Sequence, residues 1–394
     1  MEYLIILLLL LILGYRYEVK SSAISISRKN KLEYVVVVYL IVLSGFAYNV
    51  GSDIPIYMNE YDTYSYYNIT KLFASSDFVN RQPGWLLLCY ICHSISSDFV
   101  VLKLVIAIIV NLSIYFFIKK NTRNVFISLF FFCVFLYLDT NFNSLRQGLS
   151  IAFFLLSFES LKRFNYKKYY LLALGAYMFH ISAILIFIFP LLGWLKIGKR
   201  SLVYVTLFLL LTSILIIRFD IAFQINAFML AGGFMDNESA SLAAERYLSG
   251  DLANNLNFFG LTSAFIYLSS IAIIVYLYSK QENEHSRFSF LILFFLFSIL
   301  NFTLPVVFSR YLMYFLMFFS ITLSDVIVRF LHEHRSPVFM FGLILLIYIY
   351  KPINTLFLYN QRRDSALIEQ YYPYYSVFNK QIDSNRASLY GFHE

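Results

Sequence analysis

Residues 99–118 read FVVLKLVIAIIVNLSIYFFI, a run of apolar side chains interrupted by one charged residue, Lys103. An α-helix rises about 1.5 Å per residue, so a run of this length crosses the roughly 30 Å hydrocarbon layer of a bilayer. The stretch therefore predicts a membrane-spanning helix.

Similar apolar runs recur along nearly the whole chain. The sequence is 60% hydrophobic, 20% aromatic and only 14% charged, whereas soluble domains are about 25% charged. This composition excludes soluble globular, disordered and disulfide-scaffold proteins. It predicts an all-α fold, a polytopic transmembrane helix bundle of about 10–12 spans that forms a single integral membrane domain over residues 1–394. The spans are expected near 2–15, 34–50, 99–118, 124–138, 145–161, a bent pair within 169–195, 202–218, 258–279, 288–308, 311–329 and 338–350.

The distribution of charge predicts the sidedness of the bundle. The loop from Arg16 to Glu33 is rich in lysine and arginine, and the positive-inside rule keeps such a loop in the cytoplasm, with the N-terminus outside. The same topology places three long segments outside: loops 51–82 and 219–257 and the tail 351–394. The net charge of +8 thus reflects basic cytoplasmic loops and not nucleic-acid binding. The expected location is a membrane that the chain crosses many times.

Residues 83–97 form a shorter apolar stretch, which begins Pro83-Gly84-Trp85. A stretch of this length is typical of a re-entrant or partial helix, which a membrane protein tolerates where protein or a water-filled cavity surrounds it. We expect it not to span.

Arg146 lies in the most informative motif, Asn141-Phe142-Asn143-Ser144-Leu145-Arg146-Gln147-Gly148. Ser144 and Gln147 have the spacing of a capping box, which would place Arg146 in the first turn of a helix at the outer surface. The N-terminus of a helix attracts anions, and an arginine there is unfavourable unless a negative partner is expected. The alternative interpretation is an arginine that extends to the lipid headgroups.

His180 lies in the middle of the apolar run 169–195, between basic residues at both ends. Because both ends are then cytoplasmic, the run must fold as a hairpin, with His180 and Ser182 at its outer turn. An ionisable residue at membrane depth indicates function by default. The alternative is a neutral histidine that hydrogen-bonds a backbone carbonyl.

Other outer residues could contribute to the same chemistry. Asp62 is either a general base or a solvated loop carboxylate. Arg310 begins the sequence RYLMYF at the outer end of a helix, where an interfacial anchor is the alternative. Arg81 and Arg246 are further basic candidates on the outer side.

Motifs for cofactors carry little weight in this sequence. Cys89-Tyr90-Ile91-Cys92-His93 matches the attachment pattern of c-type haem, but it lies in an apolar helix where buried cysteines are the simpler interpretation. The pair His332 and His334 has no third zinc ligand nearby. ATP-binding and dinucleotide-binding motifs are absent from the sequence. We therefore expect neither a metal nor a cofactor.

Taken together, these motifs resemble the EpsG-type branch of the Wzy polysaccharide polymerases. The resemblance runs from about Asp62 to Phe378 and is carried by the following stretches: YDTYSYY, NFNSLRQGLSIAFF, KRFNYKK, ALGAYMFHISAILI, SRYLMYF and YYPYYSVF. The usual family variant has an acidic residue before the proline near position 83, where this chain has Arg81-Gln82, so no role is transferred to that element.

The resemblance implies the organisation of a C-type glycosyltransferase. Such a polymerase joins oligosaccharide repeat units carried on undecaprenyl pyrophosphate at the outer face of the cytoplasmic membrane, giving O-antigen, capsule or exopolysaccharide. Its expected partners are these lipid-linked oligosaccharides and membrane lipid, together with the flippase and the chain-length regulator of the pathway.

The expected mechanism assigns roles to the candidate residues. Arg146, Gln147 and Arg310 would bind the pyrophosphate, and His180 or Asp62 would act as the base. Two other classes stay open: a transporter or flippase of lipid-linked sugar precursors, and a membrane O-acetyltransferase of the same pathway. A transporter would need ionisable residues along a central cavity, and an acetyltransferase would need a cytoplasmic route for its acyl donor.

Overall fold

The computed structural model describes most of the N-terminal half of the chain and shorter parts beyond it. The described ranges are 2–20, 25–51, 53–64, 81–192, 305–333 and 374–381, with some isolated residues, Tyr371 among them. The chain forms two compact units, Met1–Pro190 with Ile349–Glu394, and Leu191–Tyr348. The following predicted segments lie wholly or largely outside the described residues: 202–218, 219–257, 258–279, 338–350 and most of 351–394. The predicted segment 288–308 is described in part.

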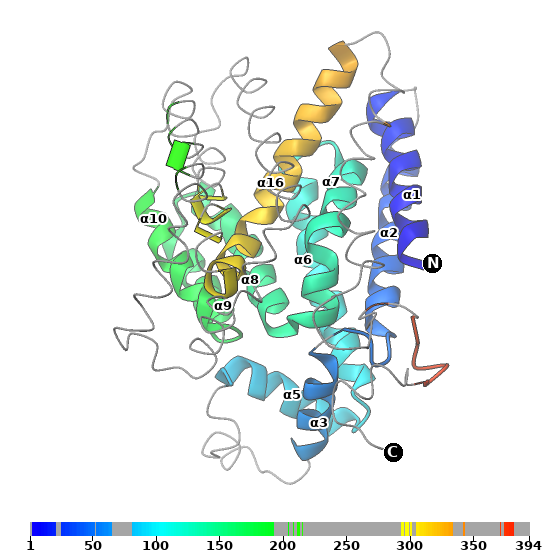
Figure 1. The fold of residues 1–394 in the computed structure, drawn as a ribbon, viewed down its shortest axis with the longest axis vertical. Helices are drawn as coiled ribbons and strands as arrows, with labels where there is room; N and C mark the ends of the chain where they lie inside the picture. The colour runs from blue at the N-terminus through cyan, green and yellow to red at the C-terminus, as the bar shows by residue number, and fades with distance from the viewer. Residues whose placement is uncertain are drawn as a thin grey trace. The chain divides into compact units, whose positions relative to one another are not determined.

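The first unit is a bundle of helices. Its main members are α1 (Glu2–Gly14), α2 (Ile26–Gly45), α6 (Val100–Asn121), α7 (Val125–Phe132), α8 (Leu145–Lys162) and α9 (Tyr166–Tyr177). Helix α6 packs against α2 and α8, α8 packs against α9, and α1 packs against α7 (Figure 1). Apart from isolated bridges at Ala47 and Ser376, the regular structure of the described residues is helical, which confirms the all-α prediction for this part of the chain.

Two of the described helices are long and apolar enough to cross a membrane. They are α6, which coincides with the predicted span 99–118, and the Phe308–His332 part of α16 (Pro305–Glu333). Other predicted spans are represented by shorter apolar helices, such as α7 with its extension to Tyr137. A bundle of about 10–12 spans therefore stays a prediction.

Helix α16 belongs to the second unit and corrects one predicted boundary. It begins at Pro305, whereas the sequence pattern placed the start of this span at residue 311. Proline is well suited to the first turn of a helix, because its missing N–H group would have no partner there. Arg310 is an exposed residue near the start of this helix. The rings of Phe315 and Phe319 pack on those of Phe297 and Phe294, with centroids 5.4 and 4.5 Å apart.

Two π-helical segments connect α7 to α8: η4 (Cys133–Tyr137) and η5 (Asp139–Asn143). Single-turn π-helices are rare and are often found at functional sites. The Tyr137 hydroxyl donates to the Leu40 carbonyl of α2 at 2.7 Å, and the Asn111 amide of α6 donates to Asn141 Oδ1 at 2.8 Å. These contacts fix η5, and hence the start of α8, against the rest of the bundle.

Helices α3 (Ile54–Thr63) and α5 (Pro83–Ile95) lie together beyond one end of α6 (Figure 1). The Tyr57 and Trp85 rings are 5.1 Å apart, and the Tyr61 hydroxyl donates to the Ser96 carbonyl at 2.9 Å. Helix α5 has 13 residues, a length of about 20 Å that is too short for a span. This length agrees with the prediction of a re-entrant or partial helix at 83–97, whose place in the membrane stays a prediction. The predicted outer loop 51–82, by contrast, contains α3, which the sequence pattern did not indicate.

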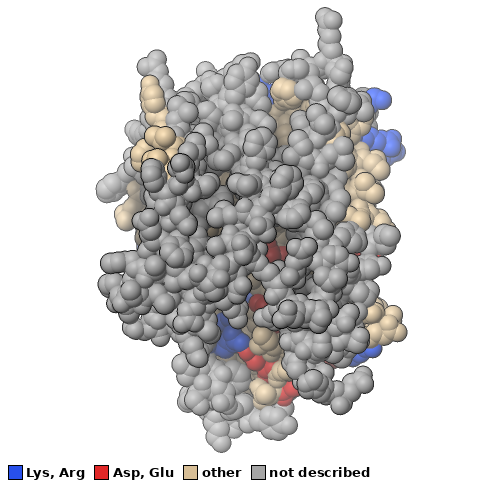
Figure 2. Space-filling view, in the orientation of Figure 1, with Lys and Arg blue, Asp and Glu red and all other residues tan. Residues whose placement is uncertain are grey.

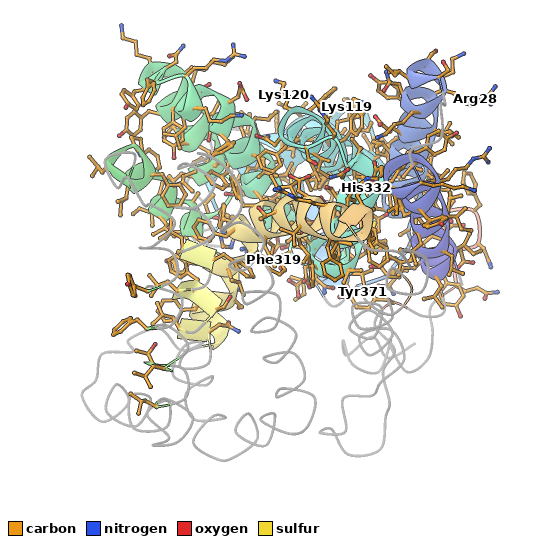
Figure 3. All side chains as sticks on the ribbon, turned by 90° about the horizontal axis from the view of Figure 1, so that it is seen from above. Arg28, Lys119, Lys120, Phe319, His332 and Tyr371 are labelled. Carbon is orange, nitrogen blue, oxygen red and sulfur yellow. The ribbon has the colours of Figure 1, made fainter. Side chains whose placement is uncertain are left out.

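The basic connections of the bundle meet at the opposite end. Lys29 Nζ donates to the Arg123 carbonyl at 2.9 Å, and Lys119 pairs with the fully buried Glu33. Arg28, Lys119 and Lys120 are labelled in Figure 3, which looks along the long axis of Figure 1. These are the connections that the positive-inside rule assigns to the cytoplasm.

Candidate functional site

Arg146 lies in the first turn of α8, as predicted, and its guanidinium faces neutral side chains of two other elements. Its Nη1 donates to Gln82 Oε1 at 3.1 Å, and its positive charge lies close enough to the Tyr57 hydroxyl of α3 to oppose the rise that burial causes in the Tyr57 pKa. The side chain is half-buried. Arg146 therefore joins α3, the start of α5 and the start of α8 at one point.

The predicted capping box is wrong in its side-chain contacts. Ser144 is the N-cap of α8 but makes no side-chain capping hydrogen bond, and Gln147 is buried, with 1% of its surface exposed. The physical reason lies in η5, since the Ser144 amide is already engaged with the Asp139 carbonyl at 2.7 Å. The N-cap thus has φ −91° and ψ 63°, outside the extended region from which a serine side chain caps.

Arg81 is a second arginine close to Tyr57. It forms a bidentate pair with Glu60 of α3, in which Nε lies 3.1 Å from Oε2. Its guanidinium also lies 6.0 Å from the centre of the Tyr57 ring. Burial, followed by the positive charge of Arg146, lowers the pKa of Arg81 from its usual value. Two guanidinium groups thus converge on Tyr57, close enough to repel each other. In Figure 2, basic and acidic side chains adjoin near α3 and α5.

A close backbone contact holds the start of α5 in this position. The Gly84 amide donates to the Met178 carbonyl at the end of α9, at 2.8 Å. A Cβ atom at position 84 would lie only 2.7 Å from that carbonyl oxygen, so the approach requires glycine. The contact fixes Gln82 beside Arg146 and brings the turn at His180 to the same end of the bundle.

His180 lies at that turn, between α9 and the 3-10 helix η6 (Ile181–Ile188), as the predicted hairpin requires. The ring of Tyr170 on one limb stacks on Phe187 on the other at 6.2 Å, which confirms the hairpin. His180 is buried and caps η6, because its Nδ1 accepts the Ser182 amide at 3.2 Å and lies 2.6 Å from Ser182 Oγ. With Nδ1 as an acceptor, the neutral ring carries its proton on Nε2 and presents a donor there.

The model of the EpsG family matches residues 31–376, which include Arg81, Arg146 and His180. The chain belongs to the EpsG family. No curated protein and no solved structure matches it. Family membership, together with the two apolar helices, identifies the chain as a membrane protein of polysaccharide biosynthesis.

We call Arg81, Arg146, Tyr57, Glu60 and Gln82 the Arg81–Arg146 group. The other candidate residues of this EpsG-family protein lie apart from this group or outside the described residues. Asp62 is exposed on α3, whereas Tyr57, Tyr61 and Tyr64 of the same helix are buried. Arg310 belongs to the second unit. Arg246 lies outside the described residues. Within those residues, no group of three metal-binding side chains is found.

Three members of the group were not predicted from the sequence: Tyr57, Glu60 and Gln82. A helical signal was present for two of them, since Tyr57 and Glu60 are three residues apart and so lie on the same face of a helix. Gln82 carried no signal of its own, because its contact with Arg146 joins positions 64 residues apart. Gln82 directly precedes Pro83, at the place where the usual variant of the family has an acidic residue.

Proposed function

We propose that this EpsG-family protein is a glycosyltransferase that polymerises oligosaccharide repeat units linked to undecaprenyl pyrophosphate, at the outer face of the bacterial cytoplasmic membrane. The observation that supports it is the convergence of Arg81 and Arg146 on Tyr57 at the N-terminus of α8. Two neighbouring guanidinium groups and the first turn of a helix together form a site for a multiply charged anion such as pyrophosphate.

In the proposed reaction, the two guanidinium groups act on the pyrophosphate leaving group. A hydroxyl oxygen of the acceptor repeat unit attacks the anomeric carbon of the donor, and the bond from this carbon to the pyrophosphate oxygen breaks. Negative charge grows on the departing undecaprenyl pyrophosphate, where Arg146 and Arg81 stabilise it most in the transition state. Glu60 holds the Arg81 guanidinium in a fixed orientation before the ligand arrives.

The acceptor proton requires a base with a free lone pair. His180 uses its Nδ1 to accept the Ser182 amide, so its Nδ1 lone pair is already engaged and His180 is the less suitable base. Asp62 is an exposed carboxylate at the end of α3, apart from the two arginines, and we propose it as the base for an acceptor hydroxyl that binds at this exposed face of α3. Gln147 is a secondary binding candidate. Gln147 would have to act through the backbone of α8, because its own side chain is buried.

A gel of surface polysaccharide from cells that lack the chain tests the proposal. Loss of a polymerase leaves single repeat units attached to the lipid anchor, whereas loss of a flippase leaves none outside. Loss of an O-acetyltransferase leaves polymer of normal length that lacks acetyl groups. Normal polymer, or the absence of any repeat unit from the surface, would therefore overturn the polymerase assignment.

A further inference from the structure

The C-terminal tail contains a segment that packs on the first unit of the bundle. This tail segment consists of Tyr371 and residues 374–381. It pairs with the turn between α2 and α3, where the Tyr48 amide donates to the Tyr375 carbonyl and the Val377 amide donates to the Phe46 carbonyl, both at 2.9 Å. The turn leads directly into α3, which carries Tyr57 and Glu60.

Tyr371 connects the same segment to η5. Asn143 Nδ2 donates to the Tyr371 hydroxyl, and the Tyr371 ring meets the Phe142 ring edge-on with centroids 6.3 Å apart. Tyr371 is buried, with 7% of its surface exposed. The Phe142 ring is held from other directions by Lys103 Nζ at 4.8 Å and by the Tyr137 ring at 5.7 Å.

The tail segment has a third contact, between α5 and α6. Lys380 lies 3.5 Å from Asp98, in the link that follows α5. Both side chains are about half exposed, so this pair adds little stability. Together the three contacts lie next to α3, α5 and α8, the elements that supply the Arg81–Arg146 group. Figure 3 labels Tyr371.

The contact with η5 has the most direct route to Arg146. Asn143 is the residue before Ser144, the N-cap of α8, and Arg146 follows within the first turn. The backbone of η5 is confined from the other side by Gly51, which has φ 111° and faces the Phe142 carbonyl. A shift of η5 must therefore move the start of α8 and the guanidinium with it.

We infer that Tyr371 is a positioning residue for Arg146, acting through Asn143 and Phe142 of η5. The inference rests on the proposed polymerase function. Its physical basis is that catalytic groups must be held within a fraction of an ångström, since a misplacement of about 1 Å can cost about 100-fold in rate. The tail segment would thus be required for catalysis without contacting the substrate.

The test compares Tyr371→Phe, Asn143→Ala and the double variant, as detergent-purified proteins acting on a lipid-linked repeat unit. Tyr371→Phe keeps the ring on Phe142 and removes only the hydroxyl. Each single variant should lower kcat about tenfold or more with a small change in KM. The double variant should be no worse than the poorer single one, because both changes remove the same contact. Additive losses, or an unchanged kcat in Tyr371→Phe, would overturn the inference.

Two controls separate this role from a structural one and from the proposed function. Tyr374→Phe removes another hydroxyl of the tail segment, which donates to the Leu43 carbonyl of α2 at 2.9 Å. It should keep the wild-type kcat, and an equal loss there would assign Tyr371 a general structural role. Arg146→Ala must be inactive in the same assay. If it is active, the proposed pyrophosphate site fails, whereas inactive Arg146→Ala beside fully active Tyr371→Phe contradicts the positioning role alone.

Discussion

At the residue scale, substitution of Arg146 distinguishes a pyrophosphate-binding role from an interfacial anchor, because lysine keeps the charge of arginine but not its shape. A guanidinium can donate to Gln82, Tyr57 and a phosphate oxygen at once, whereas an ammonium acts as a point charge. We expect Arg146→Lys to lose most surface polymer and Arg146→Ala to lose all of it, at equal amounts of protein in the membrane. Polymer length on a gel measures the effect.

The control for this prediction lies at the other end of the same helix. Arg163 is the C-cap of α8, and its exposed side chain pairs with Glu159 at 3.1 Å. Arg163→Lys should leave polymer length unchanged, since an exposed pair of this kind contributes little. Normal polymer in Arg146→Lys would mean that Arg146 serves as an interfacial anchor.

At the element scale, α5 depends on the close approach of Gly84 to α9. A Cβ atom in Gly84→Ala would lie 2.7 Å from the Met178 carbonyl oxygen and 2.9 Å from Met178 Cβ, so α5 must move away. We expect a loss of about 1–3 kcal/mol in stability and a strong loss of polymer, because Gln82 moves away from Arg146. Thermal unfolding of the purified protein and a polysaccharide gel measure the two effects.

Gly342→Ala provides the matched control, since a Cβ atom there meets nothing within 4 Å. It should leave both the unfolding temperature and the polymer unchanged. Equal behaviour of the two alanine variants would show that the contact between α5 and α9 is not required.

Helix α7 has a buried carboxylate at its start, which predicts a pH dependence. Glu18 accepts the Phe126 and Ile127 amides at 2.8 and 3.0 Å and lies 3.2 Å from Lys29 Nζ. Burial raises the pKa of Glu18 from 4.5 to about 7. The folded protein therefore holds this proton more tightly than the unfolded chain, and the stability that Glu18 contributes falls as the pH rises from about 4.5 to 7.

Glu18→Gln keeps a hydrogen-bond acceptor at the start of α7 but does not titrate. Other groups titrate in both proteins, so the difference between their unfolding temperatures isolates Glu18. Relative to the variant, the wild type should lose stability between pH 4.5 and 7. A constant difference over this range would contradict the raised pKa.

The sequence predicted those helix starts and breaks that are set by residues adjacent in the chain. The start of α8 at Leu145, the break at His180 and the partial helix after Pro83 all depend on residues adjacent in the chain. Contacts between distant positions could not be predicted this way. Gln82 and Arg146 are 64 residues apart, and Asn143 and Tyr371 are 228 apart. The capping box failed for the same reason, because the π-helical backbone before Ser144 is set by packing against α2 and α6.

At the scale of the whole molecule, the two ends of the first unit should face opposite sides of the membrane. The three native cysteines are buried, so single introduced cysteines can be labelled against a low background. We expect cysteines at Asp62 and Phe378 to react with an impermeant thiol reagent in intact spheroplasts. A cysteine at Phe164, exposed among the basic connections, should react only after lysis.

Positions 62, 378 and 164 are all exposed, so their reactivity reports the side of the membrane and not burial. The same pattern of labelling at all three positions, or the reverse pattern, would contradict the predicted topology.

The tail segment also has a consequence for the order of synthesis. A ribosome makes α8 and inserts it long before it reaches Tyr371, which is 228 residues beyond the partner Asn143. Until then, the start of α8 lacks one of the contacts that hold it. Membrane insertion of α8 and the positioning of Arg146 through Tyr371 are therefore separate events in time. A nascent chain that stalls before Tyr371 would already hold α8 in the bilayer, while Arg146 would still lack the contact that positions it through η5.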